Sequence, residues 1–218
     1  MSSIINFEAL AQSKVKMPDT PYSTYAGVFN QDIPASVFPE DHFEYHAQRK
    51  LLEALGKKES PAWYQHHVKT RALLELGQST IFEANTLDPI WHEIAHDLLS
   101  QSYRESISEA AQFDVTGLEF QAHFWEFGAG SFFQPHVDKA HKKITHLMYL
   151  TEDWTPDHGG ELRILTSKNT EDVIQEIPPV NNTAVLLHRT DTAWHSVNRI
   201  PLQSDRPRRL LQVWFWNS

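Results

Sequence analysis

Residues 118–127 read LEFQAHFWEF, and six more runs of the same kind follow along the chain. Each run is short and rich in aromatic and branched residues, and turn residues separate it from the next, which is typical of antiparallel strands. The six are KITHLMYL (143–150), ELRIL (161–165), DVIQEI (172–177), TAVLLH (183–188), WHSVNRI (194–200) and RRLLQVWFW (208–216). Seven such runs predict a double-stranded β-helix, a jelly-roll or cupin-like barrel, over residues 113–218.

The N-terminal half has a different pattern. Residues 40–55 (EDHFEYHAQRKLLEAL) and 60–77 (SPAWYQHHVKTRALLELG) space their apolar residues near 3.6, and Asp88 and Pro89 mark the start of a third helix. Helices followed by antiparallel strands indicate the α+β class, with the N-terminal helices packed on one sheet. At 25.2 kDa we expect a single domain, 1–218, mainly helical over 1–112 and a jelly roll over 113–218.

Composition limits both metal and partner. Cysteine is absent, so a metal must be held by His, Asp, Glu or water. A formal charge of -9 and a pI near 5.8 argue against nucleic acid as a partner. No apolar run reaches the roughly 18 residues of a membrane span. The first residues show no secretory signal, so we expect no membrane association and a cytoplasmic protein.

Two motifs could bind a metal. His92–His96 reads HEIAH, which matches the helix of zinc peptidases, in which two histidines bind zinc and Glu93 is the general base. The residues after it, DLLSQSYRES, supply no identifiable third ligand. We therefore favour an ordinary amphipathic helix here, with the motif on its wet face, and keep a zinc peptidase as a remote alternative.

The second motif is the triplet HVD at His136–Asp138. Residues i and i+2 of a strand face the same side, so His136 and Asp138 can both point into the barrel. A third ligand must come from another strand, and His195 in the WHSV run is the natural candidate. Two histidines and one carboxylate form a facial triad, which suits non-haem iron and leaves coordination positions open.

The last strand-like run places its two arginines on opposite faces. Alternation puts Arg208 on one face with Leu210, Gln212 and Trp214, whereas Arg209 lies on the other. Only one arginine can therefore face the metal. In KITHLMYL, alternation likewise puts Leu147 and Tyr149 on a common face with Thr145.

From about Phe124 to Phe215 the chain resembles the iron(II) and 2-oxoglutarate dependent oxygenase superfamily, within it the prolyl-hydroxylase-like branch. The resemblance rests on an ordered series of motifs covering under half of the chain. These are FWEFGAGSFFQ (124–134), HVD (136–138), MYL (148–150), GGELRI (159–164), VLLH (185–188), WHSV (194–197) and an arginine six residues before the tryptophan of RRLLQVWFW (208–216).

The resemblance implies a role for each matched residue. His136, Asp138 and His195 would bind Fe(II), and Tyr149 would donate a hydrogen bond to 2-oxoglutarate. Arg208, preferred to Arg209 because of its distance from Trp214, would bind the distal carboxylate. Leu147, Gln212 and Trp214 would wall the pocket. Ascorbate is a candidate reductant. Outside this context, Tyr149 and Trp214 would read as core aromatics, and His141, His146, His158 and His188 are expected to be structural.

The implied reaction is hydroxylation of an unactivated C–H bond, in which O2 is consumed and 2-oxoglutarate is decarboxylated to succinate. The presence of Asp138 argues against halogenation, since related halogenases leave that position open; desaturation and cyclisation would use the same ligands. We expect a small-molecule substrate, an amino acid or a natural-product intermediate. The same-class alternative is a prolyl or other protein-residue hydroxylase, and a non-enzymatic jelly-roll binding module is a remote one.

Overall fold

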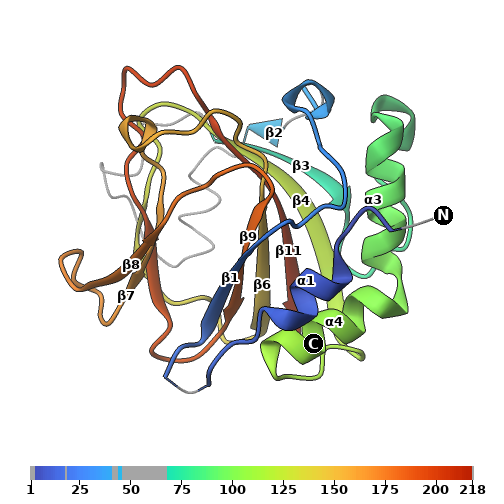
Figure 1. Cartoon of the computed structure of the whole chain (residues 1–218), viewed down its shortest axis with the longest axis horizontal. Coiled ribbons are helices and arrows are strands. Elements are labelled where there is room, and N and C mark those ends of the chain that lie inside the picture. The colour runs from blue at the N-terminus through green and yellow to red at the C-terminus, as the bar shows by residue number, and fades with distance from the viewer. Residues whose placement is uncertain (1–2, 18, 41–43, 46–67, 218) are drawn as a thin grey trace.

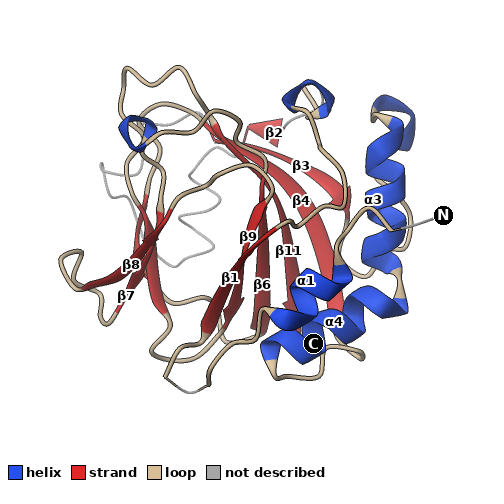
Figure 2. Cartoon of the chain, viewed as in Figure 1, coloured by secondary structure: helices blue, strands red, loops and turns tan. Residues whose placement is uncertain are grey.

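The computed structural model describes residues 3–17, 19–40, 44–45 and 68–217. In this part of the chain two antiparallel sheets face each other, and three α-helices cover the outer face of the larger sheet (Figure 1). Figure 2 shows that the three α-helices lie on one side only, whereas no α-helix covers the outer face of the smaller sheet in the described chain. The space between the two sheets therefore remains for a binding site.

The larger sheet has seven strands in the order β1-β9-β6-β11-β4-β3-β2. Their bounds are β1 Tyr22–Ala26, β2 Glu44–Tyr45, β3 Val68–Leu74, β4 Glu119–Phe127, β6 Lys142–Tyr149, β9 Thr183–His188 and β11 Arg208–Trp216. The smaller sheet has the order β5-β10-β7-β8, with β5 Phe133–His136, β7 Leu162–Leu165, β8 Val173–Ile177 and β10 Trp194–Val197. Strands distant in sequence pair in both sheets, as a jelly roll requires.

Alternation along β11 divides the interior into two cores. Leu211, Val213 and Phe215 pack with the helices on the outer face of the larger sheet. Leu210 and Trp214 instead pack between the sheets, together with residues of β4, β6 and β7. This division follows from the period of two in a strand, because consecutive side chains point to opposite faces.

The helices begin at capping residues. Asp88 accepts from the backbone N–H of Ile90 at the start of α3 (Pro89–Leu99), and Ser100 accepts from that of Tyr103 at the start of α4 (Gln101–Ala111). Asn6 caps α1 in the same way. The remaining bounds are α1 Phe7–Gln12, η1 Ala35–Val37, η3 Ala84–Thr86 and η4 Pro156–His158.

The predicted fold class is confirmed, and all seven predicted strands are present. The helix predicted over residues 60–77 is wrong where it can be compared, because Val68–Leu74 is strand β3. Both faces of β3 are largely buried, so its apolar residues follow no clean alternation, and its pairing with β4 shifts register between Ala72 and Leu74. A short apolar run of this kind cannot be distinguished from a buried helix by periodicity.

Other parts of the N-terminal half also differ from the expectation. Glu44–Tyr45 forms β2 rather than helix, while residues 41–43, 46–55 and 60–67 of the predicted helices lie outside the described residues. Tyr22–Ala26 pairs with β9 as an edge strand that we did not predict. The stretch before residue 113 is therefore not simply helical. Among the described helices, none is long and apolar enough to cross a membrane.

Candidate active site

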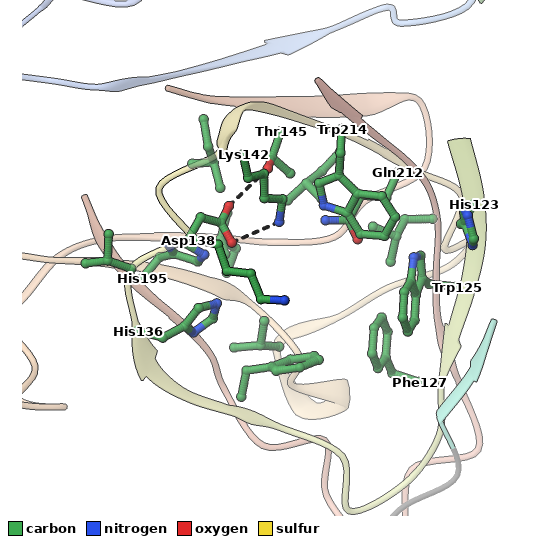
Figure 3. Close-up of a pocket in the computed structure, with 18 of the residues that line it drawn as sticks. His123, Trp125, Phe127, His136, Asp138, Lys142, Thr145, His195, Gln212 and Trp214 are labelled. Atoms are coloured by element: carbon green, nitrogen blue, oxygen red, sulfur yellow. Dashed lines mark hydrogen bonds and ion pairs between the residues drawn. The ribbon is translucent and has the colours of Figure 1, made fainter. Parts of the chain in front are cut away.

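His136, Asp138 and His195 meet between the two sheets. His136 ends β5, and His195 on β10 is its direct cross-strand partner, with the ring centroids 4.3 Å apart. One ligand atom from each of the three residues lies within 4.8 Å of the others. Across the described chain, no other cluster of His, Asp or Glu has metal-binding geometry. Figure 3 shows the three side chains at one side of a cavity.

Asp138 reaches this position by a different route from the one expected. The strand ends at His136, and Asp138 follows in the connection to β6, so strand alternation does not explain its orientation. Two side chains of β6 hold the carboxylate instead. Lys142 Nζ donates to Oδ1 over 2.9 Å, and Thr145 Oγ1 donates to Oδ2 over 3.0 Å (Figure 3).

Hydrogen bonds also orient both imidazole rings. The Nδ1 atoms of His136 and His195 lie 2.9 and 3.0 Å from the carbonyl oxygens of Gln134 and Ala193. A carbonyl can only accept, so each Nδ1 carries the proton and each Nε2 keeps a free lone pair. This is the tautomer that a metal ligand bonded through Nε2 requires.

The electrostatics keep the triad in its ligand form. Burial and the neighbouring His195 lower the pKa of His136 to about 3, so its ring is neutral. For Asp138, burial alone would raise the pKa, but the charge of Lys142 and its hydrogen bond to the carboxylate outweigh burial and hold the pKa below its usual range. A neutral His136 ring and an ionised Asp138 carboxylate match the donor types that Fe(II) takes in facial triads.

The triad borders a cavity of about 300 Å³ that also contains Arg208. Arg208 is only 4% exposed, yet none of the described carboxylates forms an ion pair with it. Its Nη2 donates to the Tyr149 hydroxyl over 3.3 Å, its guanidinium lies over the rings of Phe127 and Tyr149, and its Nε has no hydrogen-bond partner in the described chain. Because a buried unpaired cation is costly, this arrangement favours an anionic ligand.

Two neighbours define the surroundings of Arg208. Gly160 has φ +80°, and a Cβ built there would lie 3.2 Å from Arg208 Cδ, so a larger residue would press on the arginine. Arg209 points to the other face of β11, where it pairs with Glu126 at 2.8 Å and covers Phe38. Of the two arginines, only Arg208 lines the cavity.

The expected wall residues Leu147, Gln212 and Trp214 line the same cavity. Sequence reasoning missed the wall supplied by β4, whose inward residues are Gln121, His123, Trp125 and Phe127, and it missed Lys142. The alternation of β4 in LEFQAHFWEF would have indicated the first group. No comparable signal marks Lys142, because its contact depends on the connection that carries Asp138.

The HEIAH helix does not form a second metal site. His92 Nε2 lies 2.9 Å from the carbonyl oxygen of Ala84, which occupies the nitrogen that a metal would need. Glu93 and His96 are exposed on α3. The geometry therefore contradicts the zinc peptidase alternative.

The other histidines noted in the sequence also have structural surroundings. His146 is buried between two tyrosine hydroxyls, His158 caps η4, and His188 hydrogen-bonds to a backbone carbonyl. His141 is exposed and stacks on Trp216.

Comparison with known proteins agrees with this geometry. The sequence profile of the 2OG-Fe(II) oxygenase superfamily matches residues 120–216, which include all three triad residues, Tyr149 and Arg208. No curated protein sequence matches the chain. Similar solved structures include a prolyl-4-hydroxylase from Pseudomonas putida, with TM-score 0.56 and 20% identity, covering 98% of this chain and 100% of that one.

Two further structures share the fold. Prolyl 4-hydroxylase from Phytophthora capsici gives TM-score 0.58 and 18% identity, covering 100% of this chain and 68% of that one. A prolyl hydroxylase from Trichoplax adhaerens, solved in complex with a hypoxia inducible factor peptide fragment, gives TM-score 0.56 and 15% identity, covering 96% of this chain and 88% of that one. Residues 120–216, which contain the triad, Tyr149 and Arg208, therefore match the 2OG-Fe(II) oxygenase superfamily, whose members use Fe(II) and 2-oxoglutarate.

Proposed function

We propose that this enzyme hydroxylates an unactivated C–H bond of a small molecule, an amino acid or a natural-product intermediate, while 2-oxoglutarate is decarboxylated to succinate. The observation that carries the proposal is the shared cavity: the triad and the unpaired Arg208 line one space of about 300 Å³. A metal and an anionic keto acid could be held there side by side.

In this proposal His136, Asp138 and His195 bind Fe(II), and Arg208 and Tyr149 bind the distal carboxylate of 2-oxoglutarate. When bound, the two cofactors supply the activation of dioxygen through oxidative decarboxylation of the keto acid. The chain contributes geometry. His136, Asp138 and His195 would hold the metal, Asp138 would supply the carboxylate that the related halogenases lack, and Arg208 would bind one end of the keto acid.

The cavity size favours a small molecule. A volume of about 300 Å³ lies at the lower end of the range for small-ligand pockets, and 2-oxoglutarate must share it with the substrate. Apolar side chains, among them Leu162, Leu187 and Val197, line the same space and would keep water from the reacting C–H bond.

Hydroxylation of a prolyl or other protein residue is the second candidate. It is supported by the fold, which is shared with prolyl hydroxylases, one of them solved with a peptide fragment. At 15% to 20% identity this likeness concerns the fold and not the substrate. The small-molecule candidate remains our first proposal because the cavity is small.

Substrate-dependent succinate formation distinguishes the two candidates. The purified chain would be supplied with Fe(II), 2-oxoglutarate and labelled dioxygen, together with either a panel of amino acids and small organic acids or a panel of proline-containing peptides. We expect label in a small-molecule product, no turnover in His136→Ala, and unchanged turnover in His92→Ala. Label found only in a peptide would overturn the small-molecule proposal in favour of the second candidate.

A further inference from the structure

The cavity continues beyond the part that the cofactors would occupy. Trp214 lies six positions after Arg208 along β11, which corresponds to about 20 Å of extended strand. Trp214 pairs in register with Thr145 and Gln121, and Thr145 holds the triad carboxylate. The metal ligands are therefore level with Trp214 rather than with Arg208. We call the part of the cavity formed by Gln121, Lys142, Gln212, Trp214 and Trp216 the outer end.

The outer end carries hydrogen-bond donors without partners. The Lys142 side chain is 12% exposed, and only one of its three N–H groups is used, by Asp138. The indole Nε1 atoms of Trp214 and Trp216 are buried and lack a hydrogen-bond partner among the described residues. Within the same part of the chain, the side-chain amides of Gln121 and Gln212 make no hydrogen bond either. The two glutamines are half-buried, whereas the two indole N–H groups are buried donors that need an acceptor.

The charge of the cavity points to an anionic acceptor. The cations Arg208 and Lys142 line it with little exposure and Lys139 lines its exposed edge, whereas Asp138 is the single carboxylate among its described lining residues. The charges of Fe(II) and of doubly ionised 2-oxoglutarate cancel, so the loaded cavity keeps its positive excess. A further carboxylate would reduce this excess and accept from the free donors of the outer end.

The wall next to the outer end, supplied by β4, is aromatic. Trp125 meets Trp214 edge to face with centroids 6.0 Å apart and stacks on Phe127 at 5.6 Å, and His123 lies 5.5 Å from Trp214 (Figure 3). Surfaces of this kind bind planar apolar groups. The polar end and the aromatic wall together describe a ligand with two parts.

We propose that the outer end binds the carboxylate of a small organic acid, with Lys142, Gln212 and Trp216 as its donors and Trp125 and Trp214 packed against its apolar body. Because the triad lies beside Trp214, this placement brings a C–H bond of the acid next to the metal. That the acid is the substrate rests on the proposed function, whereas its binding can be tested without turnover.

The test uses phenylacetate and its neutral match phenylacetamide as probes, titrated calorimetrically into the full chain. One series uses the holoenzyme with Fe(II) and 2-oxoglutarate under argon, and the other uses metal-free protein. We expect the acid to bind at least about tenfold more tightly than the amide in both series, since the amide has a similar shape but lacks the charge. Equal binding of the two probes would overturn the proposal, even if the enzyme oxidises other compounds.

Variants locate the carboxylate. The preference for the acid should vanish in Lys142→Met and fall several-fold in Gln212→Leu. The second variant retains the ion pair between Lys142 and Asp138, so its effect cannot be attributed to loss of that pair. The preference should persist in Lys143→Met, the matched control on the neighbouring residue. A preference that is lost in Arg208→Gln but kept in Lys142→Met, measured without metal, would place the acid at the cofactor end and contradict the proposal.

A tetrapeptide ending in phenylalanine distinguishes a free acid from a peptide terminus. Weaker binding than phenylacetate is expected for a site built for small acids. Tighter binding, sensitive to Lys142→Met, would overturn the assignment to a small acid.

Discussion

Arg208 is the residue whose environment is hardest to explain without a ligand. It is 4% exposed, its Nε is unpaired within the described chain, and its guanidinium lies over the rings of Phe127 and Tyr149. Burial raises the pKa of Tyr149 while Arg208 lowers it, and the net rise keeps the hydroxyl protonated as a donor. Both groups can therefore donate to one carboxylate.

Substitution of Arg208 should separate cofactor binding from folding. Arg208→Gln is expected to weaken 2-oxoglutarate binding by about 30- to 100-fold, the loss of a charge-assisted pair. The melting temperature of the cofactor-free chain should not fall, because the variant removes a buried cation without a counter-charge. Calorimetry with Arg209→Gln as the matched control checks both, and unchanged affinity in Arg208→Gln would show that the keto acid binds elsewhere.

Thr145 is expected to act on the metal through Asp138. Thr145→Val keeps the shape of the side chain but removes the 3.0 Å hydrogen bond to Oδ2, so Fe(II) affinity should fall about tenfold. Anaerobic metal titration measures this, with the exposed Thr170→Val as control. If both variants bind Fe(II) like the parent chain, the hydrogen bond does not orient the ligand.

At the scale of elements, His146 joins β6 to two neighbours. Its Nε2 lies 2.8 Å from the Tyr25 hydroxyl of β1, and its Nδ1 lies 2.9 Å from the Tyr103 hydroxyl of α4. Burial lowers the pKa of His146 to about 3. The ring is therefore neutral in the fold, whereas the unfolded chain protonates near 6.5.

This shift predicts acid sensitivity. Below about pH 6.5 His146 binds a proton in the unfolded chain but not in the folded chain. The free energy of unfolding therefore decreases as the pH falls, down to about pH 3. From pH 7 to pH 5 the loss attributable to His146 is about 2 kcal/mol. Denaturant unfolding at pH 7 and pH 5 should show a loss of unfolding free energy that is smaller in His146→Gln than in the parent chain by this amount. An equal loss in both proteins would mean that another group is responsible.

The elements also show what the sequence could predict. A strand such as β11 could be predicted because its two faces lie in different environments. Its side chains therefore alternate in character along the sequence. β3 could not be predicted in this way, because burial on both faces hides the period, and the edge strand β1 was missed because it is short and half-buried. In the candidate site, His195 lies on a predicted strand, whereas His136 ends β5, which is not among the seven predicted runs. The position of Asp138 depends on Lys142 and Thr145 across a turn.

For the whole molecule, the N-terminal part completes the larger sheet at both edges and covers its outer face. β1 pairs with β9, β3 pairs with β4, and α3 and α4 pack over the strands. The N-terminus is tied to this cover by Asp97 of α3, whose carboxylate accepts from the backbone N–H of Ile4 and Ile5 at 2.6 and 2.8 Å.

A fragment of residues 113–218 should therefore not fold alone, although it contains the triad and Arg208. Without α3, α4 and β3, the apolar outer face of β4, β6 and β11 would be exposed to water. Circular dichroism and amide proton NMR of the fragment check this against the full chain. A folded fragment with dispersed resonances would show that the jelly roll is an independent domain.

The central claim is that His136, Asp138 and His195 hold Fe(II) beside 2-oxoglutarate, and anaerobic absorption spectroscopy tests it most directly. The purified chain with Fe(II) and 2-oxoglutarate should develop a weak visible charge-transfer band that neither cofactor gives alone. The band should persist in His92→Ala and be absent in His136→Ala. A chain that shows no band, or a band that survives in His136→Ala, would contradict the assignment of the site.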